Sequence, residues 1–245
     1  SFGRHTVQAV LGGEIKEDNA ESDSYSVTGF LNDSQTYPSD GAQYPLSGRP
    51  SGSSSIVRMA GAFATVNYSF DNRYMIDGSY RVDGSSKFGA NHKYGFFPSG
   101  AFAWRISEEK FMKDVRWIDE LKLRVGYGVT GSEPSSPYLS HLKYSFGSPV
   151  LIDGKYVYTI APHMNANPDL KWEEKHEFSA GLDFALFDYR LSGSVDFYNR
   201  TTDGLLYEYN VPVPPNLAST TLANVGKVSN TGVEVMLSGG IVRTK

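Results

Sequence analysis

The chain has 245 residues, no cysteine and a formal net charge of −4, with 23 Lys and Arg against 27 Asp and Glu. This balance argues against a nucleic-acid partner, because phosphate binding needs a surplus of cations. The lack of cysteine excludes a disulfide framework and thiolate chemistry. No run of about 18 apolar residues occurs, which excludes a transmembrane helix but leaves membrane-spanning strands possible.

Alternation of apolar and polar residues dominates the chain. From Ile76 to Asp83, and again from Leu121 to Thr130, apolar residues or glycine alternate with polar or small ones. A period of two is typical of a strand with one apolar and one polar face. The pattern predicts eight strands, most of them long enough for the roughly 9 to 11 residues that a tilted membrane strand needs. The alternation runs over residues 5–17, 62–70, 74–83, 96–106, 121–130, 181–186, 190–197 and 230–241, where we expect the eight strands.

Short and long connections alternate between these strands. Tight turns are predicted at 71–73 and at Asp188, and aromatic residues flank both. At the other end lie long polar segments rich in Ser, Gly, Asn and Pro, namely 18–55, 84–95, 132–170 and 203–227. Short periplasmic turns, long outer loops and an aromatic girdle are typical of an outer-membrane barrel. We therefore predict an all-β fold, an antiparallel up-and-down transmembrane β-barrel segment of about eight strands, with a soluble β-sandwich or propeller as the alternative.

One connection at the short-turn end has a different pattern. Ser107 is a good N-cap, Glu108 and Glu109 follow it, and Phe111, Val115 and Ile118 are spaced for one helical face. The segment predicts a short amphipathic helix over 107–118. Such a helix would plug the barrel rim or lie at the lipid boundary.

Motifs that suggest chemistry are weak in this chain. Residues 126–131 read Gly-Tyr-Gly-Val-Thr-Gly, but no helix is expected after them, as a dinucleotide site would require. The five histidines lack metal-ligand spacing, and no nucleophile elbow occurs. We predict that the protein is not an enzyme and carries no metal or cofactor.

The segment 132–170 has residues suited to binding. It contains several aromatic side chains among Asp, Asn and Lys, and flat rings beside hydrogen-bonding groups suit sugars or peptides. The alternative is that the rings only pack the loops together. The tyrosines concerned are Tyr138, Tyr144, Tyr156 and Tyr158.

Several segments together resemble one family, the SusC-like (SusC/RagA) TonB-dependent outer-membrane transporters of Bacteroidota. They run in order from about 56 to 237. They include Asn72-Arg73-Tyr74, Arg81-Val82-Asp83-Gly84-Ser85-Ser86-Lys87-Phe88-Gly89, Phe97-Pro98-Ser99, Trp104-Arg105-Ile106-Ser107-Glu108-Glu109, Leu121-Lys122-Leu123-Arg124, Gly128-Val129-Thr130-Gly131, Asn167-Pro168-Asp169-Leu170-Lys171-Trp172-Glu173, Gly181-Leu182-Asp183-Phe184, Val211-Pro212-Val213-Pro214-Pro215, Asn224-Val225-Gly226-Lys227-Val228 and Gly232-Val233-Glu234.

The resemblance implies a barrel of about twenty-two strands, of which residues 1–245 would supply about eight. The family's plug domain, TonB-contacting segment and signal peptide have no counterpart in this sequence. The implied partners are a SusD-like surface lipoprotein that acts as a lid, the TonB complex acting through the plug, and outer-membrane lipid. The implied substrate is a glycan oligomer or a peptide.

The resemblance also assigns roles to residues. A polar lumen wall would include Asp77, Arg81, Lys122, Arg124 and Asp196, and the four loop tyrosines would contact ligand or lid. Leu123 and Val125 would then face lipid, because a one-residue step along a strand changes the face. The implied location is the outer membrane of a Gram-negative bacterium. Two alternatives remain open: a soluble carbohydrate-binding β-domain, and an outer-membrane barrel that secretes, adheres or scaffolds.

Overall fold

The computed structural model describes residues 3–43 and 50–240, in which ten strands account for most of the chain. The last predicted strand reaches Ile241, which lies outside the described residues. The strands are β1 (His5–Ser24), β2 (Ser51–Phe70), β3 (Tyr74–Ser85), β4 (Tyr94–Arg105), β5 (Ile118–Ser132), β6 (Lys143–Ile152), β7 (Lys155–Met164), β8 (Glu173–Leu186), β9 (Leu191–Asn210) and β10 (Thr220–Gly239).

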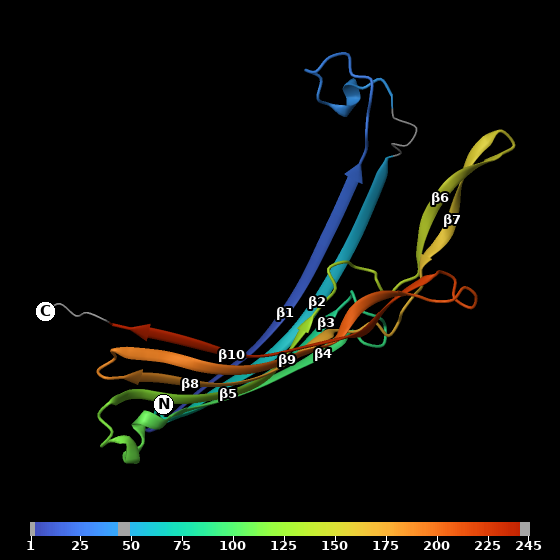
Figure 1. The fold of residues 1–245 in the computed structure, drawn as a ribbon. Helices are drawn as coiled ribbons and strands as arrows, with labels where there is room; N and C mark the ends of the chain where they lie inside the picture. Colours follow the sequence, from blue (N-terminus) through green and yellow to red (C-terminus); the bar gives the residue numbers. More distant parts are fainter. Residues whose placement is uncertain (1–2, 44–49, 241–245) are drawn as a thin grey trace.

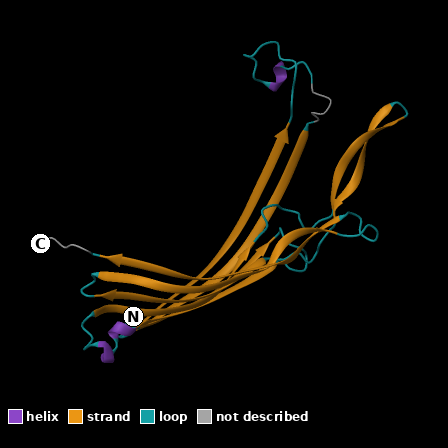
Figure 2. Ribbon diagram, in the orientation of Figure 1, coloured by secondary structure: helices purple, strands orange, loops and turns teal. Residues whose placement is uncertain are grey.

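Eight of these strands form one antiparallel sheet in the order β1-β2-β3-β4-β5-β8-β9-β10. β5 pairs with β8 because β6 and β7 form a separate hairpin between them. The sheet is long and curved, with β1 and β10 at its two edges (Figure 1). The predicted antiparallel up-and-down sheet of eight strands is confirmed. No described helix is long and apolar enough to cross a membrane, and the helical turns η1 (Pro38–Asp40), η2 (Ile106–Glu108) and η3 (Lys110–Met112) have three residues each (Figure 2).

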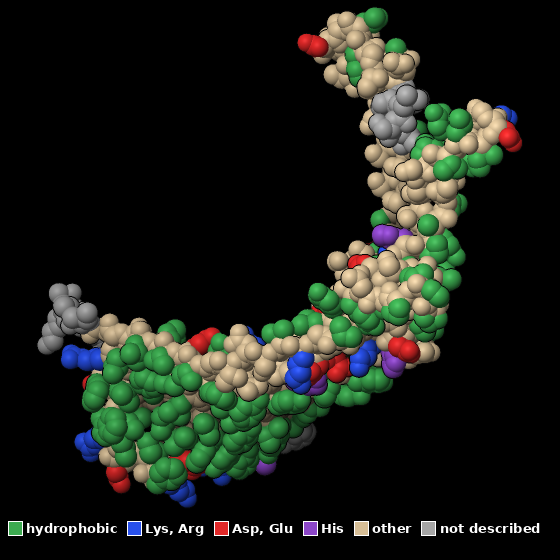
Figure 3. All heavy atoms as spheres, turned by 45° about the vertical axis from the view of Figure 1, so that its right-hand side comes forward, with side chains coloured by type: hydrophobic (Ala, Val, Ile, Leu, Met, Phe, Trp, Pro, Cys, Tyr) green, Lys and Arg blue, Asp and Glu red, His purple; other side chains and the backbone are tan. Residues whose placement is uncertain are grey.

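The strand registers give the sheet two unlike faces. Leu123 lies opposite Trp104 and Leu182, whereas its neighbour Arg124 lies opposite Ala103 and Gly181. Directly opposed residues of antiparallel strands share a face, so most large apolar side chains gather on one face of the sheet and the charged side chains of the central strands on the other. Hydrophobic side chains cover the convex face near the short turns (Figure 3). The polar rows therefore line the concave face.

An apolar band of defined height crosses the convex face. Along β1, every side chain on this face between His5 and Glu17 is apolar or glycine. His5 lies opposite Phe70 at the short-turn end, and Glu17 forms an ion pair of 2.6 Å with Arg58 at the other end. The strand rises about 40 Å between these two boundaries at about 3.3 Å per residue. A strand tilt of about 40° reduces that to about 30 Å, the thickness of a bilayer core.

The short-turn end carries the predicted aromatic girdle. Asp71 and Asn72 turn the chain with φ of 56° and 51°, which Asp and Asn tolerate better than most residues. Phe70, Tyr74 and Trp104 then stack in a row, with successive ring centroids 6.4 Å apart. Rings with a polar edge suit the membrane–water boundary. Short turns are typical of the periplasmic rim of a membrane barrel, so we expect this end on the periplasmic side.

The amphipathic helix predicted over 107–118 is wrong. The segment forms the two short turns η2 and η3, and Ser107 lies inside η2, whose N-cap position is occupied by Arg105. Between them, Glu109 is extended, with φ of −75° and ψ of 149°. Its carboxylate accepts hydrogen bonds from the Tyr74 hydroxyl, from Trp104 Nε1 at 3.1 Å and from Arg73 Nη1 at 3.2 Å. These tertiary bonds hold Glu109 out of the helical conformation that its sequence neighbours favour.

The long-connection end contains more strand than predicted. β9 continues to Asn210 and β10 begins at Thr220, so most of the segment 203–227 is strand and only 211–219 is a loop. A bulge at Asn224–Lys227 and a positive φ of 70° at Gly204 interrupt the alternation there, which hides the strands from a period-two search. The predicted loop 132–170 likewise contains the β6–β7 hairpin.

Candidate functional site: the concave wall and the outer rim

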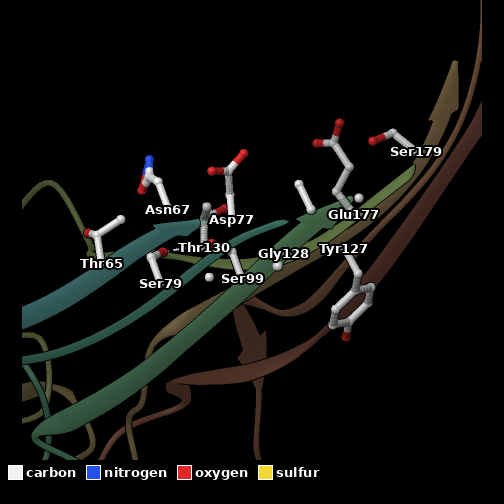
Figure 4. Close-up of a pocket in the computed structure, with 14 residues that line it drawn as sticks. Thr65, Asn67, Asp77, Ser79, Ser99, Tyr127, Gly128, Thr130, Glu177 and Ser179 are labelled. Carbon is white, nitrogen blue, oxygen red and sulfur yellow. Dashed lines mark hydrogen bonds between the residues drawn. The ribbon is translucent and has the colours of Figure 1, made fainter. Parts of the chain in front are cut away.

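A polar hollow lies on the concave wall where β2, β3, β4, β5 and β8 run side by side. Asn67, Asp77 and Glu177 project from this side of the sheet, whereas Tyr127 projects from the other (Figure 4). The space arises because Gly126 and Gly128 place no side chain there. The remaining polar lining is Thr65, Ser79, Ser99, Thr130 and Ser179. The motif at 126–131 thus lies within β5 and opens a hollow in the wall.

Arg124 is the centre of an ion cluster on this wall. Its guanidinium donates to Asp183 at 2.7 and 2.8 Å and to Asp196 at 2.8 Å. Gly181 makes the cluster possible, because a Cβ there would lie 2.3 Å from Asp196 Oδ1 and 2.8 Å from Arg124 Nη2. The sequence prediction paired these side chains on one face, but the role of Asp183 was missed.

Arg81 repeats the arrangement nearer the other edge of the sheet, with partners on β1 and β3. It donates to Asp83 at 2.6 Å and to Glu14 at 3.3 Å. Gly61 leaves the space, since a Cβ there would lie 2.1 Å from Asp83 Oδ1. The guanidinium also lies 5.8 Å from the ring centroid of Phe63, which explains an aromatic residue on a polar face.

The structure places all five predicted lumen residues on the concave face, by strand register. Asp77 lies opposite Asn67 and Ala101, and Lys122 lies opposite Arg105 and Asp183. Arg124 and Asp196 are in contact, whereas the other three lie apart from them. Among the described residues, no three His, Asp or Glu side chains gather as metal ligands would.

The outer rim above this wall is rigidly tied together. The side-chain amide of Asn165 donates to the carbonyls of Ala218 and Thr220 and accepts from the N–H groups of Leu217 and Ala218. Asn224 does the same between Lys171 and Gly204. These bonds consume the polar groups of both asparagines. The asparagines therefore fasten the loops, and are not free to bind a ligand.

An aromatic cluster anchors the rim to the sheet. The β4–β5 ladder stops at Ser99 and Gly128, and beyond this point Phe88, Phe97 and Trp172 pack together with ring centroids 4.5 and 5.4 Å apart. Trp172 Nε1 donates to the Lys93 carbonyl at 3.2 Å. In the sequence these residues only contribute to the family resemblance, and their spacing does not predict the cluster.

The four predicted contact tyrosines fall in two places. Tyr138 lies in the β5–β6 connection, and its hydroxyl accepts from the Ile56 N–H at 2.9 Å, so it fastens a loop to β2. Tyr144, Tyr156 and Tyr158 lie on the β6–β7 hairpin. The structure thus separates Tyr138 from the other three.

The periplasmic end holds a carboxylate with a shifted pKa. The hydrogen bond donated by Tyr74 lowers the pKa of the Glu109 carboxyl below its ordinary value, and the indole of Trp104 and the charge of Arg73 act in the same direction. The side chain is only 12% exposed. Glu109 therefore fastens the β4–β5 connection to the aromatic girdle.

Comparisons with known proteins agree with this geometry. The TonB dependent receptor-like β-barrel family model matches residues 2–241. The TonB-dependent receptor SusC of Bacteroides thetaiotaomicron is 36% identical over 193 residues, which are 75% of this chain and 18% of that protein. The TonB-dependent receptor P39 of Formosa agariphila is 35% identical over 243 residues, which are 99% of this chain and 23% of that protein.

A solved structure is also similar. The RagAB peptide importer in its "closed-closed" state matches with a TM-score of 0.83 and 30% identity, over 99% of this chain and 26% of the matched one. The chain thus spans about a quarter or less of the relatives it matches. The family match agrees with the two-faced sheet and the aromatic girdle. The chain therefore belongs to the TonB-dependent receptor-like β-barrel family, and within it to the SusC-like proteins of the outer membrane.

Proposed function

We propose that the whole protein is a SusC-like TonB-dependent transporter that imports glycan oligomers or peptides across the outer membrane, and that this chain is part of its barrel wall. One observation carries the proposal. A curved sheet with an apolar convex face and an ion-rich concave face occurs in a chain that resembles both SusC and the RagAB peptide importer over most of its length.

The wall acts without covalent chemistry. Lipid covers the convex face, and the concave face borders an aqueous lumen, as in other membrane barrels. Arg81 and Arg124 are each held by two carboxylates, so neither guanidinium is an unpaired cation that could bind an anionic group tightly. Asp77 and Lys122 complete the wet wall. No step of this function requires an enzyme activity in this chain.

The proposed partners are a SusD-like surface lipoprotein at the outer rim and the TonB complex at the periplasmic side, reached through a plug. The four tyrosines Tyr138, Tyr144, Tyr156 and Tyr158 are proposed as contacts to ligand or lipoprotein. The soluble carbohydrate-binding domain is disfavoured, because large apolar side chains such as Leu11 and Ile15 are 84% and 90% exposed on the convex face.

Uptake by the complete protein in its native host tests the proposal. The host is compared with a deletion strain and with a strain that lacks TonB, using fluorescently labelled oligosaccharides and labelled peptides as separate probes. We expect both mutant strains to lose uptake of one probe class, while growth on a monosaccharide and free amino acids is unchanged. Uptake of both classes that survives the deletion would contradict the proposal.

A further inference from the structure

A groove of about 320 Å³ opens at the short-turn end, between the β4–β5 connection and the β8–β9 turn. Two arginines, one carboxylate and two aromatic rings line it, namely Arg116, Trp117, Phe187, Asp188 and Arg190. We call it the short-turn groove. The strands that lead into it, β4, β5, β8 and β9, each have a paired strand on both sides. The groove therefore does not arise at an open edge of the sheet.

Hydrogen bonds fix the two walls of the groove against each other. The Phe187 N–H donates to the Trp117 carbonyl at 3.0 Å, and the Tyr189 N–H donates to the Asp119 carboxylate at 2.9 Å. The rings of Trp117 and Phe187 stack with their centroids 6.1 Å apart. Phe187 has a φ of 60°, which glycine adopts more easily than a residue with a side chain. A strained backbone position thus carries one of the two rings of the groove.

The arginines of the short-turn groove differ from every other arginine in residues 3–43 and 50–240. Each of the others forms an ion pair with a carboxylate, whereas Arg116 and Arg190 form none within these residues. The paired ones are Arg4, Arg58, Arg73, Arg81, Arg105, Arg124 and Arg200. The two unpaired guanidinium groups thus line the same groove, where Asp188 is the one carboxylate. The groove carries a net positive charge.

A phospholipid headgroup fits this lining. Guanidinium groups form paired hydrogen bonds with phosphate oxygens, which gives geometric specificity as well as attraction. Aromatic rings favour the membrane–water boundary, where a headgroup meets its acyl chains. Leu186 and Leu191 flank the turn and lie opposite each other in the apolar rows of the convex face, so they continue the surface on which an acyl chain can pack.

We propose that the short-turn groove binds the headgroup of an anionic phospholipid from the membrane leaflet at this end. Arg116 and Arg190 hold the phosphodiester, and the rings of Trp117 and Phe187 lie against the glycerol and the first acyl carbons. Asp188 repels a doubly charged phosphate ion more than a singly charged phosphodiester, so the free ion is the poorer ligand. The inference does not depend on what the complete protein transports.

The test uses the complete protein purified in mild detergent and measures equilibrium binding of a fluorescent phosphatidylglycerol. The variant Arg116→Gln with Arg190→Gln removes both cations of the groove. The matched control, Lys110→Gln with Lys113→Gln, removes two exposed charges from the β4–β5 connection outside the groove lining. Inorganic phosphate is added as a competitor in a second arm, and the abundance of each protein in the outer membrane reports assembly.

We expect the groove variant to bind the lipid about tenfold more weakly than wild type and the control to bind within about twofold. The single variants Arg116→Gln and Arg190→Gln should each bind about threefold more weakly, and they carry the test if the double variant does not assemble. Millimolar inorganic phosphate should leave the lipid bound.

Three results would overturn the inference. Equal weakening by the groove variant and the control would show a diffuse effect of charge at this end. Unchanged binding by the groove variants would show that the lipid binds elsewhere, as it must if another part of the complete protein fills the groove. Displacement of the lipid by inorganic phosphate would make the free ion the ligand.

Discussion

The assignment of the two faces can be tested at neighbouring positions of β9. Val195 lies on the convex face opposite Leu182 and Val235, and Ser194 lies on the concave face opposite Asp183 and Met236. Arginine at each position adds the same side chain at nearly the same depth. Apart from the residue replaced, the two variants differ in the face on which the new charge appears.

The expected cost follows from the surroundings of each position. Arginine on the lipid face near the bilayer midplane costs about 2–4 kcal/mol. At position 194 the new guanidinium meets water and the Asp183 carboxylate, so we expect a change below about 1 kcal/mol, as for other solvated ion pairs.

The measurement is a urea titration of the full-length protein folded into lipid, for wild type, Val195→Arg and Ser194→Arg. We expect the free energy of unfolding to fall clearly for Val195→Arg alone. Equal losses, or a larger loss for Ser194→Arg, would refute the face assignment. The result would then also reverse the predicted roles of Leu123 and Arg124, which share the same registers.

Three further outcomes are expected. Gly181→Ala should lower the free energy of unfolding by about 1–3 kcal/mol, because the new Cβ overpacks the Arg124 cluster. Gly78→Ala should leave it unchanged or raise it slightly, because no atom lies within 4 Å of a Cβ there. Equal effects of the two substitutions in urea titrations would contradict the space argument. The pKa of Glu109 is lowered in the folded protein, so its stabilisation is present above the unfolded pKa of about 4.3 and is lost as the pH falls through the folded value; the stability gap between wild type and Glu109→Gln should close in acid. The chain by itself should aggregate without detergent, since both sheet edges and the convex face are open; a monodisperse, cooperatively melting monomer would refute this.

Strand positions were predictable where one face meets lipid and the other meets water. The segment from Leu121 to Thr130 alternates without interruption because both environments are uniform along it. Beyond the apolar belt both faces of a strand meet water, and the alternation loses its physical cause. The ends of β9 and β10, near Asp203 and Gly226, therefore looked like loops although they are paired.

Contacts that depend on the register of paired strands could not be predicted from the sequence. Arg124, Asp183 and Asp196 belong to three strands, and their meeting requires β5 to pair with β8 across an intervening hairpin. The failed helix at 107–118 has a similar origin, because Glu109 is held by side chains that only the folded girdle brings near. Local propensity is a weak prior against such tertiary bonds.

The two arginine clusters explain how the concave wall can be charged and hydrated without binding a polar solute tightly. Each guanidinium is shared by two carboxylates beside a glycine, so its positive charge is paired in place and the cluster carries a net negative charge. In the proposed transporter, a passing polar solute would hydrogen-bond briefly to Asn67, Asp77 or Ser99 in the hollow, and it would find no unpaired cation in these clusters to hold it. Weak, evenly spread contacts permit both entry and exit. We therefore expect strong binding at the outer rim and not on this wall.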